Sequence, residues 1–202
     1  MGEPRPGAAR RILDRSSLGS SRGVCHAPSH QTVLVIFTSD NGGERYSHNW
    51  PFSFQKLNLW EGGLRVPAIV RWAGVIPTGR TTEQAATTMD WTATILAVTG
   101  TKPDPSYPLD GENLLPICRG TRTVFDRSLF WRTKLQEAAR VGNWKYLKAS
   151  SREYLFDLSV DLGEKVDLST KHVEVFNKLK DQFLTWNKKM LPNPQSAPTQ
   201  AS

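Results

Sequence analysis

Residues 33–67 decide the fold, and they read VLVIFTSDNGGERYSHNWPFSFQKLNLWEGGLRVP. The stretch opens with five apolar residues, 33–37, which predict a strand buried on both faces of an α/β sheet. An acid, an amide and two glycines follow it directly. Ligands of open α/β sheets bind at the carboxyl ends of the strands. Asp40 and Asn41 are therefore candidate oxygen ligands for a hard cation, although an ordinary turn after the strand is the alternative interpretation.

A long polar loop, 42–63, follows this strand and carries His48, Lys56 and Glu61. Loops of this length inside a compact domain are usually functional. The loop ends in Gly62-Gly63, which predicts a tight turn or a close approach of two backbone segments. A second strand is expected over 65–72, and its proline indicates the start of a strand or a sheet edge.

The composition excludes several classes of protein. The 202 residues carry a net charge of +7, but the basic residues are scattered among 19 acidic ones, so we expect no nucleic-acid partner. No apolar run approaches the roughly 20 residues that a membrane span needs. The first residues lack the apolar core of a signal peptide, which at face value indicates a cytoplasmic start. Cys25 and Cys118 lie far apart and match no metal-binding or disulfide pattern.

The middle of the chain predicts a helix over 91–98. Asp90 is the expected N-cap, and Gly100 stands where a glycine commonly ends a helix. Four apolar residues of this helix are expected to face the core: Trp91, Ile95, Leu96 and Val98. A short buried segment is expected over 114–118.

The last third has a different pattern. Short strand candidates at 128–131, 138–147 and 154–158 are separated by turn residues at 142–143 and 150–151, which predicts an antiparallel meander. An amphipathic helix follows over 172–190, with Val175, Leu179, Phe183 and Trp186 on one stripe. We therefore divide the chain into a disordered or unrelated tail (1–31), an α/β portion (32–120), a small antiparallel sheet with a C-terminal helix (121–190) and a second disordered tail (191–202).

Several of these motifs, in this order, resemble the C-terminal half of the sulfatase family. They are Thr-Ser-Asp-Asn-Gly at 38–42, Lys56 four residues before Trp-Glu-Gly-Gly at 60–63, and Arg-Val-Pro at 65–67. The resemblance extends over 32–190 and includes arylsulfatases and galactosamine-6-sulfatases. It implies an alkaline-phosphatase-like α/β fold and the hydrolysis of sulfate esters, whether small molecules or glycans. Family members are often secreted, periplasmic or lysosomal.

Residue by residue, the resemblance implies that Asp40 and Asn41 are the second pair of ligands to one calcium ion. It also implies that Lys56 contacts the substrate sulfate, and His48 is a further candidate substrate contact from the same loop. Glu61 is expected to have a structural role, as the partner of a backbone turn or of Arg65. Trp60 is expected to pack.

The departures from the family pattern are equally specific. The family's nucleophile is a cysteine of a Cys-x-Pro-Ser-Arg motif that is oxidised to formylglycine, and we expect it upstream of the sequence given. The residues around Cys25 differ in spacing and lack the arginine. With half of the metal's protein ligands and no nucleophile, the chain is expected to be an inactive fragment whose cut sheet exposes apolar edges. The alternatives are a non-catalytic chain that binds a partner or a sulfated sugar, and a phosphate or phosphonate ester hydrolase of the same superfamily.

Overall fold

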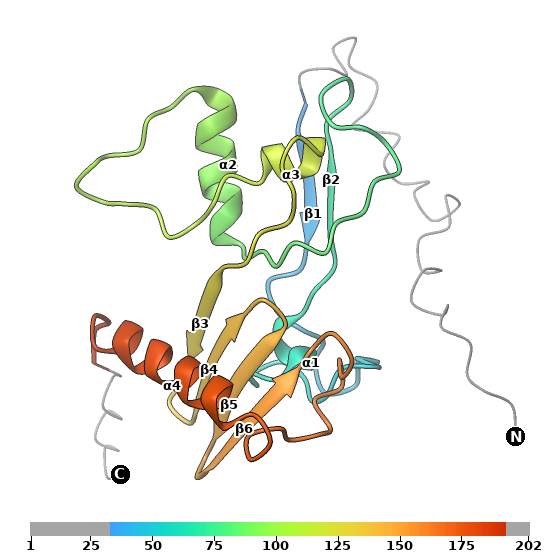
Figure 1. Ribbon diagram of the computed structural model, residues 1–202. Helices are drawn as coiled ribbons and strands as arrows, with labels where there is room; N and C mark the ends of the chain where they lie inside the picture. Colours follow the sequence, from blue (N-terminus) through green and yellow to red (C-terminus); the bar gives the residue numbers. More distant parts are fainter. Residues whose placement is uncertain (1–32, 193–202) are drawn as a thin grey trace, which may run out of the picture.

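The computed structural model describes residues 33–192, which form two parts joined near the middle of the molecule (Figure 1). The upper part holds a strand pair and two helices, and the lower part holds a four-stranded sheet with a long helix. The elements, in chain order, are β1 (Val35–Thr38), α1 (Glu61–Leu64), β2 (Ala68–Arg71), α2 (Met89–Thr99), α3 (Leu115–Arg119), β3 (Ser128–Arg132), β4 (Gln136–Val141), β5 (Trp144–Ala149), β6 (Arg152–Asp157) and α4 (Val173–Asn187). The predicted tails, 1–31 and most of 191–202, lie outside the described residues, as does Cys25.

The first strand is less buried than its sequence predicts. β1 pairs antiparallel with β2, with Phe37 opposite Ile69, and within residues 33–192 these two strands form a sheet of their own. Residues of β1 alternate between exposed and half-buried, and Phe37 is 61% exposed. The prediction of a strand buried on both faces was therefore wrong. An apolar run shows that a strand has apolar side chains to bury, but it does not show which other elements pack over them. β2 begins directly after Pro67, as predicted.

Helix α2 is present where expected, but its contacts differ. Thr88 is the N-cap, so the assignment of Asp90 to that position was wrong. Asp90 is buried inside the first turn, where its carboxylate accepts backbone N–H bonds from Thr87 at 2.6 Å and Glu112 at 2.8 Å. Gly100 ends the helix at φ 69°, as predicted.

The four apolar residues of α2 that were expected to face the core are only partly packed: Trp91, Leu96 and Val98 are half-buried, and the prediction was wrong for Ile95. Ala93 and Thr94 are buried on the inner face of the helix, whereas Ile95 is 45% exposed. α3 agrees with the short buried segment predicted from the sequence, since Leu114 and Ile117 are both buried.

The last third forms the predicted antiparallel meander, with strand order β3-β4-β5-β6. The segment 138–147 is a hairpin whose two strands turn at Gly142-Asn143, and Gly142 has a positive φ of 57° that suits glycine. Because successive strand residues point to opposite faces, Ala138 and Ala139 supply two different cores.

The two cores lie on the two faces of this sheet. On one face, Trp60 and Leu59 from the long loop pack against Leu147 and Phe156. On the other face, α4 packs on the sheet through the predicted stripe, in which Leu179 and Phe183 are buried (Figure 1). The long loop is therefore anchored on the C-terminal sheet. No helix between residues 33 and 192 is long and apolar enough to cross a membrane.

Candidate functional site

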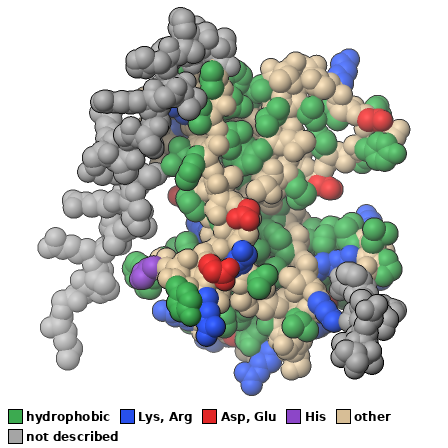
Figure 2. Space-filling view, turned by 180° about the vertical axis from the view of Figure 1, so that it is seen from behind, with side chains coloured by type: hydrophobic (Ala, Val, Ile, Leu, Met, Phe, Trp, Pro, Cys, Tyr) green, Lys and Arg blue, Asp and Glu red, His purple; other side chains and the backbone are tan. Residues whose placement is uncertain are grey.

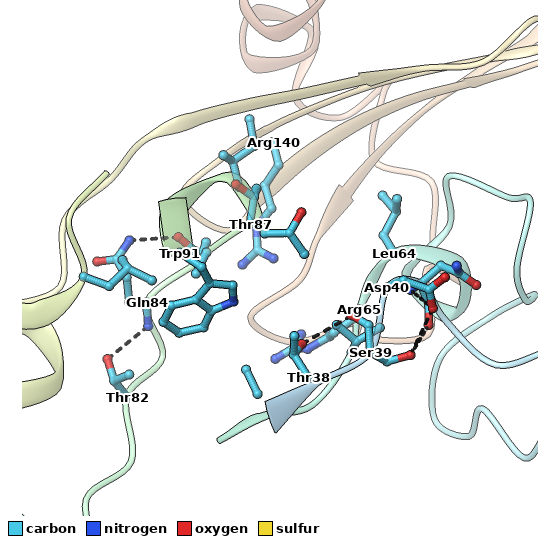
Figure 3. Close-up of a pocket in the computed structure, with 18 of the residues that line it drawn as sticks. Thr38, Ser39, Asp40, Leu64, Arg65, Thr82, Gln84, Thr87, Trp91 and Arg140 are labelled. Carbon is cyan, nitrogen blue, oxygen red and sulfur yellow. Dashed lines mark hydrogen bonds between the residues drawn. The ribbon is translucent and has the colours of Figure 1, made fainter. Parts of the chain in front are cut away.

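A cavity of about 590 Å³ lies where the upper and lower parts meet. Its walls come from the end of β1, the segment after α1, the loop before α2, and β4 (Figure 3). Asp40 and Asn41 line it together with Arg65, Trp91 and Arg140. The structure thus brings both predicted metal ligands into the lining of one cavity.

The backbone at the end of β1 is held by hydrogen bonds between side chains and backbone groups. Thr38 Oγ1 donates to the carbonyl of Pro67 at 3.0 Å, and Ser39 Oγ donates to the carbonyl of Asn41 at 2.9 Å. Asp40 Oδ1 accepts the backbone N–H of Asn41 at 3.0 Å. These bonds fix the turn that follows the strand and leave Asp40 exposed.

The oxygen donors of this turn fit part of a calcium site. Over residues 33–192, the side chain of Asn41 makes no hydrogen bond, and Asp40 Oδ2 accepts none, so both oxygens are available to a ligand. A carboxylate and an amide oxygen are the donor types that calcium prefers, but the ion takes about six to eight oxygens. The described part of the chain holds no cluster of three or more His, Cys, Asp or Glu side chains suited to a metal. Asp40 and Asn41 can therefore supply a minority of the ligands.

The loop after Asn41 folds back on α1 through close backbone contacts. Gly42 N–H donates to the carbonyl of Gly63 at 2.9 Å, and Gly62 N–H donates to the carbonyl of Ser53 at 2.9 Å. A Cβ atom at Gly42 would overlap the carbonyl of Gly62, so the approach requires glycine. The close approach that the Gly-Gly pair predicts is confirmed.

Lys56 and His48 lie elsewhere on this loop. The backbone N–H of Lys56 donates to the carbonyl of Gly43 at 2.9 Å, which ties the residue to the segment after Asn41. Its Nζ lies 3.5 Å from Glu44 Oε2, in an ion pair whose side chains are 42% and 64% exposed. His48 is exposed. Neither side chain lines the cavity, so their substrate roles stay predictions.

A buried charge network supports this loop from below, and sequence reasoning identified only part of it. Glu61 is buried, with its Oε1 2.9 Å from Lys145 Nζ and its Oε2 3.7 Å from Arg65. The predicted structural role of Glu61 and its partner Arg65 are confirmed. Lys145, Glu164 and Arg140 were missed. The available signal was a lysine within an apolar strand, on the same strand face as Leu147.

Glu164 completes this network. Its Oε1 lies 2.7 Å from Lys145 Nζ, and its Oε2 accepts the backbone N–H of Glu61 at 2.6 Å. Burial raises the pKa of Glu164. Burial also acts to raise the pKa of Glu61, but the positive charges of Lys145, Arg140 and Arg65 lower it below its usual value. Glu164 adopts a φ of 52°, a strained conformation for a non-glycine residue that places this carboxylate.

Cys118 also borders the cavity, from α3. Burial raises the pKa of its thiol, so the reactive thiolate is disfavoured at neutral pH. This environment is that of a packed cysteine and not of a nucleophile.

Comparisons with known proteins agree with the sequence motifs. A family model described as Sulfatase matches residues 27–101. The N-acetylgalactosamine-6-sulfatase of the dog, Canis lupus familiaris, is 37% identical over 122 residues, which cover 57% of this chain. The match spans 23% of the length of the dog protein.

Solved structures show the same relationship at the level of the fold. The crystal structure of Ps i-CgsB superposes with a TM-score of 0.71 and 26% identity, covering 78% of this chain and 37% of that one. The PsFucS1 sulfatase from Pseudoalteromonas sp. superposes with a TM-score of 0.65 and 20% identity, covering 82% of this chain and 39% of that one. The predicted fold class, part of an alkaline-phosphatase-like α/β fold with a small antiparallel subdomain, is confirmed.

Proposed function

We propose that the chain is a member of the sulfatase family, whose model matches residues 27–101, and that residues 33–190 supply the C-terminal part of a sulfate-ester hydrolase. In this proposal Asp40 and Asn41 provide two oxygen ligands to a calcium ion, and Lys56 contacts the sulfate of the substrate. A bound calcium ion would polarise a sulfate oxygen and offset negative charge as the ester bond breaks.

One observation carries the proposal. Asp40 and Asn41 follow a strand directly and line the cavity, and Asp40 Oδ2 and the side-chain oxygen of Asn41 accept no hydrogen bond from residues 33–192. Lys56 is bound through its backbone to Gly43, close in sequence to this pair, and keeps an exposed ammonium group. Its ion pair with Glu44 is weak because both side chains are well exposed, so an anionic substrate can displace Glu44.

Hydrolysis also requires a nucleophile. We assign this role outside the described residues, because residues 33–192 contain no Cys-x-Pro-Ser-Arg motif. The matched part of the chain spans 23% of the dog relative, which leaves most of that protein's length for further catalytic groups. Within the proposal, the 202-residue chain binds a sulfate ester and does not turn it over.

Binding of 4-nitrophenyl sulfate, measured by calorimetry with and without calcium, tests the proposal. We expect weak binding that calcium strengthens, because the ion and the ester share the site. Asp40→Ala and Lys56→Gln should each weaken it about fivefold to tenfold, the loss of one charged contact. Asp104→Ala and Lys102→Gln are matched controls, since both are exposed loop residues and Asp104 also accepts a nearby backbone N–H, at 2.8 Å.

Two results would contradict the proposal. One is equal affinity in the wild type, Asp40→Ala and Lys56→Gln, which would leave a non-catalytic chain as the better interpretation. The other is tighter binding of 4-nitrophenyl phosphate than of the sulfate, which would favour the phosphate ester hydrolases. Release of 4-nitrophenol by the chain alone, abolished in Asp40→Ala, would show that the active centre is complete and would overturn the expectation of inactivity.

A further inference from the structure

Two exposed segments of the lower part meet at the C-terminal end of α4. One is the turn between β3 and β4, residues 133–135, and the other is the segment 188–191 that follows α4. Arg132 joins them, because its NH1 donates to Asn187 Oδ1 at 2.7 Å and its NH2 donates to the carbonyl of Leu191. We call these two segments, together with Arg132, the basic corner.

The basic corner lies apart from the cavity. Figure 1 shows the C-terminal end of α4 in the lower part of the molecule, away from β1 and α2. None of the residues of the basic corner lines the cavity. Arg140, which does line it, pairs with Leu129 near the start of β3, whereas Arg132 is the last residue of that strand. A partner of the basic corner would therefore leave the cavity open.

The backbone of the basic corner is held by hydrogen bonds, yet it exposes apolar side chains. The N–H of Thr133 donates to the carbonyl of Gln136 at 2.8 Å, and residues 188–190 continue the backbone hydrogen bonds of α4. Leu135 is nevertheless 70% exposed and Leu191 is 84% exposed. Two leucines on two separate segments are thus presented to the solvent by an ordered backbone.

Basic side chains outnumber acidic ones around these leucines. This end of the sheet and of α4 carries five basic and two acidic side chains: Arg132, Lys134, Lys148, Lys188, Lys189, Glu137 and Asp181. Glu137 lies 3.3 Å from Lys148, and the neighbouring pair of Lys180 and Glu153, at 2.8 Å, adds no net charge. A surplus of three positive charges therefore remains.

The three lysines of the basic corner are free to meet an anionic partner. Lys134, Lys188 and Lys189 are exposed, and none forms an ion pair with a carboxylate within residues 33–192. Each stands within three residues of an exposed leucine of its own segment. A soluble anion would use the lysines alone, whereas the surface of an anionic bilayer also accepts apolar side chains below its charged headgroups.

We propose that the basic corner binds the surface of an anionic phospholipid bilayer. Leu135 and Leu191 enter the boundary between headgroups and acyl chains, and the three lysines lie against the headgroup phosphates. Such a contact is peripheral and needs no membrane-spanning helix. It uses neither Asp40, Lys56 nor calcium, so it stands or fails separately from the proposed hydrolytic role.

Sedimentation of the full chain with lipid vesicles, in the presence of EDTA, tests this surface. One set of vesicles is phosphatidylcholine alone, and the other holds about one part phosphatidylserine to three parts phosphatidylcholine. We expect binding to the second set only. Lys188→Gln combined with Lys189→Gln should weaken it about tenfold or more, through the loss of two charges near the membrane. Leu135→Ser and Leu191→Ser should each weaken it about fivefold.

Matched controls remove the same groups from other parts of the lower part. Lys171→Gln combined with Lys178→Gln removes two exposed lysines nearer the start of α4. Val160→Ser removes an apolar side chain that is 82% exposed in the turn after β6, at the opposite end of the sheet. Each control should weaken binding less than about twofold, since charges at a distance are screened by salt. All of these side chains are exposed, so the variants should keep the fold, which circular dichroism checks.

Two results would overturn the proposal. One is an equal loss of binding in the two double-lysine variants, which would show that net charge alone attracts the vesicles. The other is binding to vesicles that both leucine variants retain in full, together with equally tight binding of soluble polyglutamate. That second result would assign the basic corner to an acidic polymer instead of a membrane.

Discussion

The sheet of β3–β6 is packed on both of its faces, whereas the β1–β2 pair leaves apolar side chains exposed. In the lower part Leu147, Leu155 and Phe183 are completely buried. In the upper part Phe37 is 61% exposed and Val35 is 37% exposed. The space-filling view shows hydrophobic side chains spread over the upper half, and Lys and Arg side chains gathered mainly over the lower half (Figure 2).

The two parts therefore differ in how completely the described residues pack their apolar side chains. The lower part has its own two cores and anchors the long loop through Trp60 and Glu61. The upper part carries the candidate metal ligands on a strand that has one partner within the described residues. The candidate site therefore lies between the well-packed C-terminal sheet and a strand pair whose apolar side chains are partly exposed.

The largest expected effect tests the contrast in packing between the two parts directly. Phe183→Ala removes a ring that is fully buried between α4 and the sheet, and should cost about 3–5 kcal/mol of unfolding free energy. Phe37→Ala removes a mostly exposed ring and should cost about 1 kcal/mol or less. Urea denaturation followed by circular dichroism measures both. A loss for Phe37→Ala as large as that for Phe183→Ala would contradict the contrast.

The buried network gives the next effect. Lys145→Met leaves two carboxylates without their buried cation and should cost about 3–4 kcal/mol, as for other broken buried ion pairs. Lys148→Met is the matched control on the same strand, because its ion pair with Glu137 at 3.3 Å is partly exposed and should contribute less than about 1 kcal/mol. Equal losses in the two variants would show that burial does not matter here.

A smaller effect concerns the junction between the two parts. Gly42→Ala places a Cβ atom against the carbonyl of Gly62 and should cost about 1–3 kcal/mol through overpacking. The displacement of the backbone at this contact should also change the backbone amide signals of Asn41 and Lys56 in NMR spectra, because both residues are tied to the contact. Gly79→Ala is the control for adding a methyl group, since a Cβ there meets no atom within 4 Å, although its φ of 72° adds backbone strain. Unchanged Asn41 and Lys56 signals in Gly42→Ala would contradict the proposed coupling.

The pH dependence of stability gives the smallest effect and distinguishes the two buried carboxylates, Glu61 and Glu164. The raised pKa of Glu164 contributes stability that is fully present below its unfolded pKa and is lost as the pH rises through the folded pKa. The lowered pKa of Glu61 contributes stability above its unfolded pKa that is lost as the pH falls through the folded one. Glu164→Gln imitates the protonated form, so its melting temperature relative to the wild type should be highest near pH 7 and fall toward pH 4.5. A difference that is constant with pH would refute the assignment for Glu164.

The sequence predicted the meander and the last helix because their signals are local. Turn residues at 142–143 and the stripe through Leu179 and Phe183 lie within a few residues of the structure they specify. The charge network was missed because its members are distant in sequence: Lys145 is 84 residues and Glu164 is 103 residues from Glu61. The burial of β1 was overestimated for a related reason, because the sequence of an apolar strand does not show which elements pack against it.

Calcium titration of the isotope-labelled chain, followed through the amide signals of Asp40 and Asn41, tests the central claim most directly. We predict shifts centred on these two residues that saturate only at millimolar calcium, that disappear in Asp40→Ala, and that persist in Asp104→Ala. Weak binding is expected because two protein ligands supply a minority of the oxygens that calcium takes. Shifts that avoid Asp40 and Asn41, or that survive in Asp40→Ala, would contradict the claim that this turn is part of a metal site.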